Sequence, residues 1–302
     1  EDGIRDTSVT GVQTCALPIY LPDFIINLKN GKFLNLNNFN STIKQLPGFK
    51  LIFEKIKYIN LVETNNYEDI DFNFVNSNIF NLLIFENTQI ENQIHSRMKK
   101  TDLSLIENIL YLGYLKRNYP QRFNEKIKKF SFKSNFDINA LKLYFNNEIN
   151  INKKPNKQFI FANLFSYLSF VTSSQKNIPN SYLKILNEIS HFVDPLLGTS
   201  NYFLAEIYSN EKNFKIALNK LNRIQQNSFM FLYSRIKKYK ILKMINKSKS
   251  NKFLKSIQKK YPNNNEVLFL IANNYRDQNK CDQAIKIYNK LIEQSKNKYN
   301  YY

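Results

Sequence analysis

Apolar residues in the last third of the chain recur every three or four positions, the spacing that places them on one face of an α-helix. Short polar segments separate these periodic stretches, and residues 210–213 and 246–250 are predicted as turns. No strand-like alternation of apolar and polar residues interrupts them. The pattern therefore predicts an all-α region with helices near residues 203–208, 214–224, 228–245, 253–261, 267–275 and 281–293.

Helical spacing continues upstream with less regularity. A further run that reaches Ile43 is expected to pair with the first helix. The polar segment Lys153–Lys157 contains Pro155 and is the best linker candidate. We therefore expect diverged helical repeats over residues 20–154 and clearer repeats over residues 155–302, while an unrelated helical domain stays open for the first half. The upstream helices are predicted near residues 21–28, 51–62, 79–85, 89–100, 103–116, 123–130, 138–145, 158–173 and 179–192.

Alanine is rare in this chain, and its positions repeat. Only six alanines follow residue 19, and four of them form two pairs, each with a spacing of 12 residues. The pairs are 67 residues apart, close to two periods of about 34 residues. A small side chain is needed where two helices cross closely, so these positions predict helix packing. With the tyrosine that follows each first alanine, the two sets are Ala205, Tyr208 and Ala217, and Ala272, Tyr275 and Ala284.

This arrangement resembles the tetratricopeptide repeat, in which small residues and aromatics alternate over a helix pair and a proline closes the unit. The resemblance implies an antiparallel helix-pair solenoid, with the clearest units at about 198–230 and 265–298. A degenerate unit lies between them, where the small positions fall on Lys238 or Tyr239 and on Ser250 or Asn251. The positions that match the pattern in the last unit are Leu268, Ile271, Ala272, Tyr275, Ala284 and Tyr288, preceded by Pro262.

In this family, exposed positions on each first helix line a concave groove that binds proteins or peptides. The family's chaperone-tail clamp is not expected, because Phe269 occupies a clamp lysine position. The alternative that the matching positions are merely exposed stays open. The resemblance places in the groove Tyr202, Glu206, Ser209 and Asn210 from one unit, and Glu266, Phe269, Asn273, Arg276 and Asp277 from the other.

Residues 1–19 differ in character from the rest of the chain. Their sequence resembles a translated sequencing adaptor, so we expect them to be non-native and the chain to be a bacterial, metagenomic fragment. Setting them aside removes Cys15 and leaves Cys281, so cysteine usage does not indicate a compartment. Cytoplasm and periplasm both stay open.

The chain is strongly basic, with 44 Lys and Arg against 24 Asp and Glu, a formal net charge of +20. Such a charge favours acidic proteins, nucleic acid or an anionic membrane as partners. AT-rich codons also raise the lysine and asparagine content without any partner. The longest apolar-rich stretch, residues 159–171, is broken by polar residues and is too short to cross a membrane.

No pattern of catalytic, cofactor or metal-ligating residues stands out. His95 and His191 lack a second ligand at helical spacing, and Cys281 has no histidine near it. We therefore expect no enzyme activity and no cofactor. The leading hypothesis is a non-catalytic scaffold that binds a protein or peptide in its groove. The alternatives are a basic helical-repeat protein that binds nucleic acid, and the helical accessory region of an enzyme whose catalytic domain lies beyond this fragment.

Overall fold

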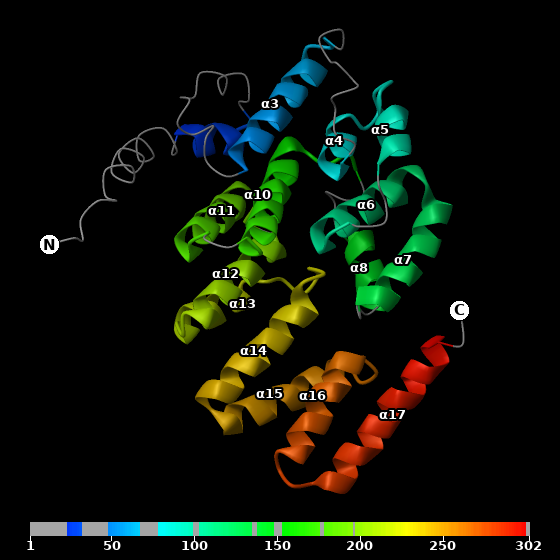
Figure 1. The fold of residues 1–302 in the computed structure, drawn as a ribbon, viewed down its shortest axis with the longest axis vertical. Helices are drawn as coiled ribbons and strands as arrows, with labels where there is room; N and C mark the ends of the chain where they lie inside the picture. The colour runs from blue at the N-terminus through cyan, green and yellow to red at the C-terminus, as the bar shows by residue number, and fades with distance from the viewer. Residues whose placement is uncertain are drawn as a thin grey trace, which may run out of the picture. The chain divides into compact units, whose positions relative to one another are not determined.

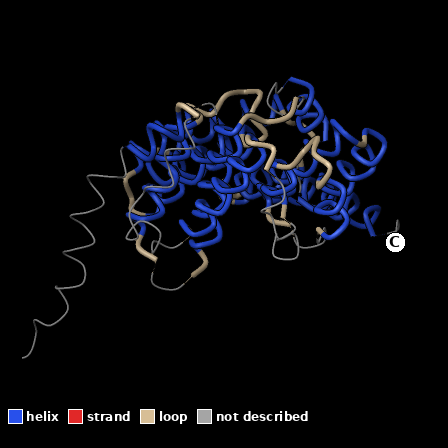
Figure 2. Tube along the Cα trace, turned by 90° about the horizontal axis from the view of Figure 1, so that it is seen from above, coloured by secondary structure: helices blue, strands red, loops and turns tan. Residues whose placement is uncertain are grey.

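The regular structure of the described residues is α-helix, and no strand occurs among them (Figures 1 and 2). The all-α prediction is therefore confirmed. The run expected to reach Ile43 lies outside the described residues. The computed structural model describes residues 23–31, 48–66, 78–98, 103–134, 138–147, 153–175, 178–195 and 197–299.

The chain forms two compact units. The first comprises Glu1–Phe123 with Glu148–Leu204, and the second comprises Asn124–Asn147 with Ala205–Tyr302. These units are defined by compactness and not by the boundaries of repeats. The expected division near residue 154 therefore stays a prediction.

Side-chain caps set where several helices of the first unit begin. Ser104 and Glu107 form a capping box at the start of one helix, which satisfies two backbone N–H groups that would otherwise lack a partner. Asn156 caps another, with its Oδ1 accepting a bond of 2.8 Å from the N–H of Phe159. The helices of this unit are residues 23–29, α3 (Phe49–Glu63), α4 (Ile79–Ile84), α5 (Glu91–Arg97), α6 (Leu105–Asn118), α10 (Lys157–Ser173) and α11 (Asn180–Val193).

Helix α10 is the centre of the first unit. It packs against α11, α4 and α6, and apolar side chains around most of its circumference are buried. Close approach of the chain to α10 requires a glycine at position 48, which has φ of 81° before α3. A Cβ atom there would lie 2.9 Å from Cδ2 of Leu168. The Gly48 backbone therefore needs both a left-handed conformation and an absent side chain.

Small and polar residues line the crossing of α10 and α11. The hydroxyl of Ser190 donates to the carbonyl of Ala162 at 2.7 Å and lies 2.9 Å from the hydroxyl of Ser166. The amide of Asn187 donates to the hydroxyl of Ser169 at 2.5 Å. The serine hydroxyls and the Nδ2 group of Asn187 thus find partners across the interface, and the small serines let the two helices approach closely.

The second unit contains the helices that the sequence predicted most clearly, and all six predicted helices are confirmed. Two boundaries were wrong. Residues 246–250 do not form a turn, because Asn246 alone separates two helices. The last helix passes the predicted end near residue 293 and continues to Tyr299. The helices are α7 (Pro120–Ser134, from residue 124), α8 (Ile138–Asn147), α12 (Gly198–Asn210, from residue 205), α13 (Phe214–Asn222), α14 (Phe231–Ile245), α15 (Lys247–Lys260), α16 (Asn265–Arg276) and α17 (Cys281–Tyr299).

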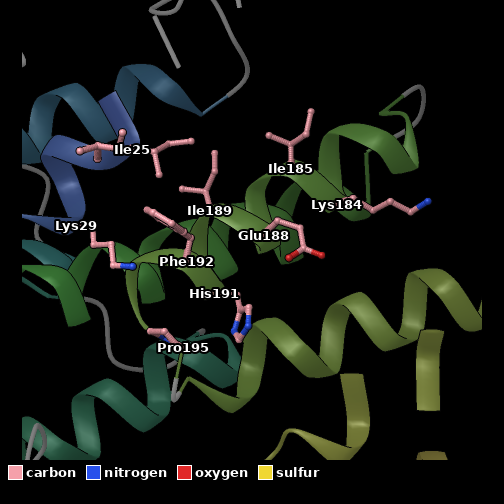
Figure 3. Close-up of a pocket in the computed structure, with 10 residues that line it drawn as sticks. Ile25, Lys29, Lys184, Ile185, Glu188, Ile189, His191, Phe192 and Pro195 are labelled. Carbon is pink, nitrogen blue, oxygen red and sulfur yellow. The ribbon is translucent and has the colours of Figure 1, made fainter. Parts of the chain in front are cut away.

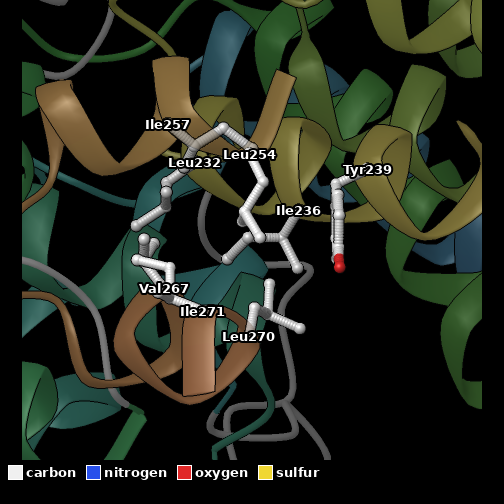
Figure 4. Packing of buried hydrophobic residues seen from close by; sticks show 8 residues of the cluster. All are labelled: Leu232, Ile236, Tyr239, Leu254, Ile257, Val267, Leu270 and Ile271. Carbon is white, nitrogen blue, oxygen red and sulfur yellow. The ribbon is translucent and has the colours of Figure 1, made fainter. Parts of the chain in front are cut away.

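Consecutive helix pairs of the second unit share one core. Apolar side chains from the pair α14–α15 meet side chains from α16 in a single buried cluster (Figure 4). A pair that buries its apolar face against the next pair is the packing unit of a helical solenoid. The cluster consists of Leu232, Ile236, Tyr239, Leu254, Ile257, Val267, Leu270 and Ile271.

A small residue recurs at the same place on successive second helices. Ala217, Ser250 and Ala284 are each the fourth residue of their helix, and each is buried. On the preceding helix of the middle pair, Tyr239 is buried whereas Lys238 is half-buried. The middle unit therefore places Tyr239 and Ser250 in the crossing, and its spacing is one residue shorter than that of the alanine pairs.

Candidate functional site

The residues predicted to pack the repeats occupy two kinds of environment. The four alanines are buried, and Ala205, Ala217 and Ala272 have no exposed surface. The three tyrosines are half-buried, and their role in filling gaps between units stays a prediction: Tyr208, Tyr275 and Tyr288.

The candidate groove residues lie on first helices of their pairs, and three acidic positions among them face lysines of α14. Glu206 of α12 lies 3.4 Å from Nζ of Lys237. On the other side of α14, Lys240 lies 3.7 Å from Glu266 of α16. Nζ of Lys243 donates to Oδ2 of Asp277 at 2.6 Å. We name this set the charged strip: Glu206, Lys237, Lys240, Lys243, Glu266 and Asp277.

The spacing of its lysines determines which neighbouring helix each lysine of the strip faces. Three lysines three residues apart follow a slowly turning line along a helix, so successive ones face first α12 and then α16. The hydrogen bond from Lys243 holds the pKa of the Asp277 carboxyl below its usual value, and the same bond raises the pKa of Lys243. Both groups are therefore charged across the neutral range.

Next to the strip, α16 presents one large exposed aromatic side chain. Phe269 is 50% exposed, and its ring meets the ring of Tyr288 edge-on with the centroids 6.2 Å apart. The hydroxyl of Tyr288 donates to Oδ1 of Asn273 at 2.8 Å. Arg276 has a side chain that is 64% exposed and lies 3.6 Å from Asp277. An apolar ring beside a row of charges is a surface that can bind a protein segment.

The remaining candidate groove residues lie on α12. Tyr202 is half-buried, and its ring lies against that of Phe203, with the centroids 6.0 Å apart. Ser209 is half-buried, and Asn210 is exposed at the end of the helix. The structure does not test whether these side chains bind a partner, so the groove assignment stays a prediction.

The first unit contains a separate apolar hollow of about 720 Å³ between the helix at residues 23–29 and α11 (Figure 3). Ile189 and Phe192 of α11 point toward the segment that carries Ile25, whereas His191 points away. Nζ of Lys29 lies 4.0 Å above the ring of Phe192. The lining is mostly apolar, so the hollow offers contact area with little directional chemistry.

The two histidines contact neighbouring side chains, and the cysteine is exposed. His95 is buried, stacks on Tyr119 at 5.3 Å between ring centroids, and has Nε2 3.2 Å from the hydroxyl of Tyr111. Nδ1 of His191 lies 3.4 Å from the side-chain nitrogen of Asn201. Cys281 is exposed at the start of α17.

Two kinds of site are absent from the described part of the chain. No group of three or more histidines, cysteines or acidic residues is placed to hold a metal ion. Within the same residues, no helix combines the length and the apolar character that crossing a membrane requires.

Sequence reasoning missed the lysine side of the charged strip. Lys237, Lys238 and Lys240 form one basic run in the sequence, whereas the structure places Lys237 and Lys240 beside carboxylates and Lys238 beside Phe253. The sequence did contain a signal for these ion pairs. Three lysines follow one another at a spacing of three residues, and acidic residues stand at the candidate groove positions of the helices before and after them.

Comparison with known proteins bears on the last helix pair. Residues 266–297, which cover α16 and most of α17, match the sequence model of the tetratricopeptide repeat. A search of curated proteins gave no match. The matched segment holds the buried Ala272 and Ala284 at the crossing of its two helices. This match identifies one tetratricopeptide repeat in the chain, and the all-α fold of stacked helix pairs agrees with it.

Proposed function

We propose that this protein is a non-catalytic scaffold that binds a protein or peptide partner along the first helices α12, α14 and α16. Tetratricopeptide repeats typically mediate protein binding, and the repeat at residues 266–297 supports that general role. The observation that carries the finer proposal is the charged strip with Phe269 beside it. The strip offers charges of both signs, and the half-exposed ring of Phe269 offers an apolar anchor of the type that dominates protein interfaces.

The ion pairs of the strip give it a preferred shape before a partner arrives. Lys237, Lys240 and Lys243 each lie against a carboxylate, so the strip is close to neutral along its length. This surface suits a partner segment that places an apolar side chain on Phe269 and polar side chains on the charged strip. A highly charged segment would fit it less well. Electrostatic complementarity would then set orientation, and burial of Phe269 would supply affinity.

The test is site-specific photo-crosslinking in cells that express the full chain. A photoreactive phenylalanine analogue replaces Phe269 on α16 in one variant and Ile285 on α17 in the control. These two side chains are almost equally exposed, at 50% and 53%, but they lie on different helices of the pair. We expect a cross-linked protein from position 269 and none from position 285. Equal cross-linking at both positions, or cross-linking only at 285, would contradict the proposal.

A further inference from the structure

Helix α14 carries two sets of cations with opposite surroundings. Lys237, Lys240 and Lys243 each have a carboxylate partner in the charged strip. Arg235 and Lys238 lie on another face of the same helix and contact aromatic rings instead. This difference within one helix points to a second surface that is distinct from the strip.

Three cations converge on that surface. The Arg235 guanidinium lies 4.6 Å from the ring centroid of Phe253, and Nζ of Lys238 lies 5.1 Å from the same centroid. From the end of α15, Nζ of Lys260 lies 4.7 Å from the centroid of Phe231, which the Arg235 guanidinium also approaches, at 5.4 Å. We name Arg235, Lys238 and Lys260 the cation cluster.

Among the described residues, no carboxylate lies within ion-pair distance of any member of the cation cluster. The polar partner of Lys238 is the side-chain oxygen of Asn222, at 2.6 Å, which carries no charge. Burial lowers the pKa of all three groups, and repulsion from Arg235 lowers those of Lys238 and Lys260 further. Like charges held together against two rings leave a local excess of positive charge that an anion would relieve.

We propose that the cation cluster binds a phosphomonoester group carried by a protein partner. A phosphomonoester offers three strong acceptor oxygens and close to two negative charges, which matches one guanidinium and two ammonium groups better than a single carboxylate does. The guanidinium of Arg235 supplies paired N–H donors, and the rings of Phe231 and Phe253 hold the cations in place.

A nucleic acid is the less favoured source of the phosphate. A nucleic-acid backbone needs a continuous basic track. The carboxylates Glu206, Glu266 and Asp277 neutralise the other lysines of α14, so such a track could continue only over the exposed lysines of α15, three of which the control variant removes. Cations already lie over the rings of Phe231 and Phe253, so nucleic-acid bases would have to displace these cations in order to stack there.

The experiment measures binding of the full chain to a fluorescent peptide pool with central phosphoserine and randomised flanking residues. The unphosphorylated pool and a 20-nucleotide oligouridine serve as further probes. The cluster variant carries Arg235→Gln, Lys238→Gln and Lys260→Gln. The control variant carries Lys249→Gln, Lys252→Gln and Lys255→Gln, which removes the same charge from exposed positions on α15.

We expect the phosphorylated pool to bind more tightly than the unphosphorylated one. The cluster variant should weaken its binding about tenfold or more, because charge-assisted hydrogen bonds are lost, while the control variant should change it much less. Equal weakening in both variants, or no preference for phosphate, overturns the proposal. Cluster-dependent oligouridine binding that is tighter than pool binding overturns it in favour of nucleic acid.

Circular dichroism would show whether the cluster variant is folded. A second measurement uses the wild-type chain and therefore does not depend on how the variant folds. In the wild-type chain, the phosphorylated pool should protect Lys238 and Lys260 from acetylation and leave Lys252 unprotected. Equal modification of these lysines with and without the pool also overturns the proposal. The site lies outside the charged strip, so its result is independent of cross-linking at Phe269.

Discussion

The hydroxyl of Tyr288 donates a hydrogen bond of 2.8 Å to the side-chain oxygen of Asn273, and it thereby joins α17 to α16. The family pattern assigned the two residues different roles, Tyr288 to packing and Asn273 to the groove. The bond makes them one structural element, because it fixes the orientation of a candidate groove side chain from the second helix. The ring of Tyr288 also supports Phe269 edge-on.

Replacing Tyr288 with phenylalanine should therefore lower the free energy of unfolding by about 0.5–1.5 kcal/mol, the usual net value of one hydrogen bond. Urea denaturation of the wild type, Tyr288→Phe, Asn273→Ala and the double variant would measure it. Because both substitutions remove the same bond, the double variant should lose less free energy of unfolding than the sum of the two single losses. Strictly additive losses would show that the two side chains do not interact.

Ser250 should tolerate alanine and reject leucine. Its side chain is fully buried at the crossing of α14 and α15, where Ala217 and Ala284 stand in the neighbouring pairs. A larger side chain would force the helices apart at a cost of about 1–3 kcal/mol. Thermal and urea unfolding would compare Ser250→Leu with Lys252→Leu, an exposed position on the same helix. Similar effects at both positions would exclude close packing at Ser250.

The ion pair between Lys243 and Asp277 should make stability depend on pH at the acid end. The folded-state pKa of Asp277 is lowered, chiefly by the hydrogen bond from Lys243. Its contribution is therefore fully present above the usual aspartate pKa, and it is lost as the pH falls through the lower folded value. The raised pKa of Lys243 extends the contribution toward alkaline pH.

We expect Asp277→Asn to lower the free energy of unfolding at neutral pH by at most about 1 kcal/mol, because the pair is partly exposed. The difference from the wild type should shrink at pH about 3, where the wild-type carboxyl begins to be protonated as well. Urea denaturation at both pH values tests this, and high salt at neutral pH should also reduce the difference. A difference that is constant with pH would mean that the charge is not responsible.

Glu86 should be the most sensitive acidic residue of the first unit. It is 1% exposed, and its carboxylate accepts two bonds from Arg117, at 2.8 and 2.7 Å, and one from Asn118, at 2.8 Å. Nζ of Lys154 donates to its backbone carbonyl at 2.6 Å. Removing one partner of a buried ion pair costs about 3–5 kcal/mol, because the other charge stays buried.

Glu86→Ala should therefore lower the midpoint of urea unfolding strongly. Glu125→Ala, an exposed position on α7, should change stability by no more than about 0.5 kcal/mol. Comparable effects of the two substitutions would mean that the Glu86 cluster contributes little to folding.

The sequence predicted the helices well because apolar periodicity depends on each helix alone. It failed at Asn246, where the run Asn246–Ser250 is as polar as a turn. In the structure, Oδ1 of Asn246 accepts from the N–H of Lys249 at 2.9 Å and caps α15. Residues 247–249 are exposed, and the buried Ser250 donates to the carbonyl of Lys247. The pattern also ended the last helix near residue 293, where the apolar spacing stops, whereas the helix continues to Tyr299.

Contacts between distant residues could not be predicted in the same way. The bond from Arg117 to Glu86 spans 31 positions, and the contact between His95 and Tyr111 spans 16. Periodicity gives the face of a helix but not the partner that meets it. The repeat register does carry such information, and it is why Glu206, Glu266 and Asp277 were assigned to one surface before their lysine partners were known.

The single-residue connection at Asn246 also governs how the chain meets a protease. A protease draws several extended residues into its cleft, and the hairpin α14–α15 supplies only one. The connections at residues 211–213 and 277–280 are longer, and Lys212 adopts φ of 60° in the first of them. Limited digestion with trypsin should therefore cleave after Lys212 or Lys280 and spare Lys247, so that the middle hairpin survives as an intact fragment.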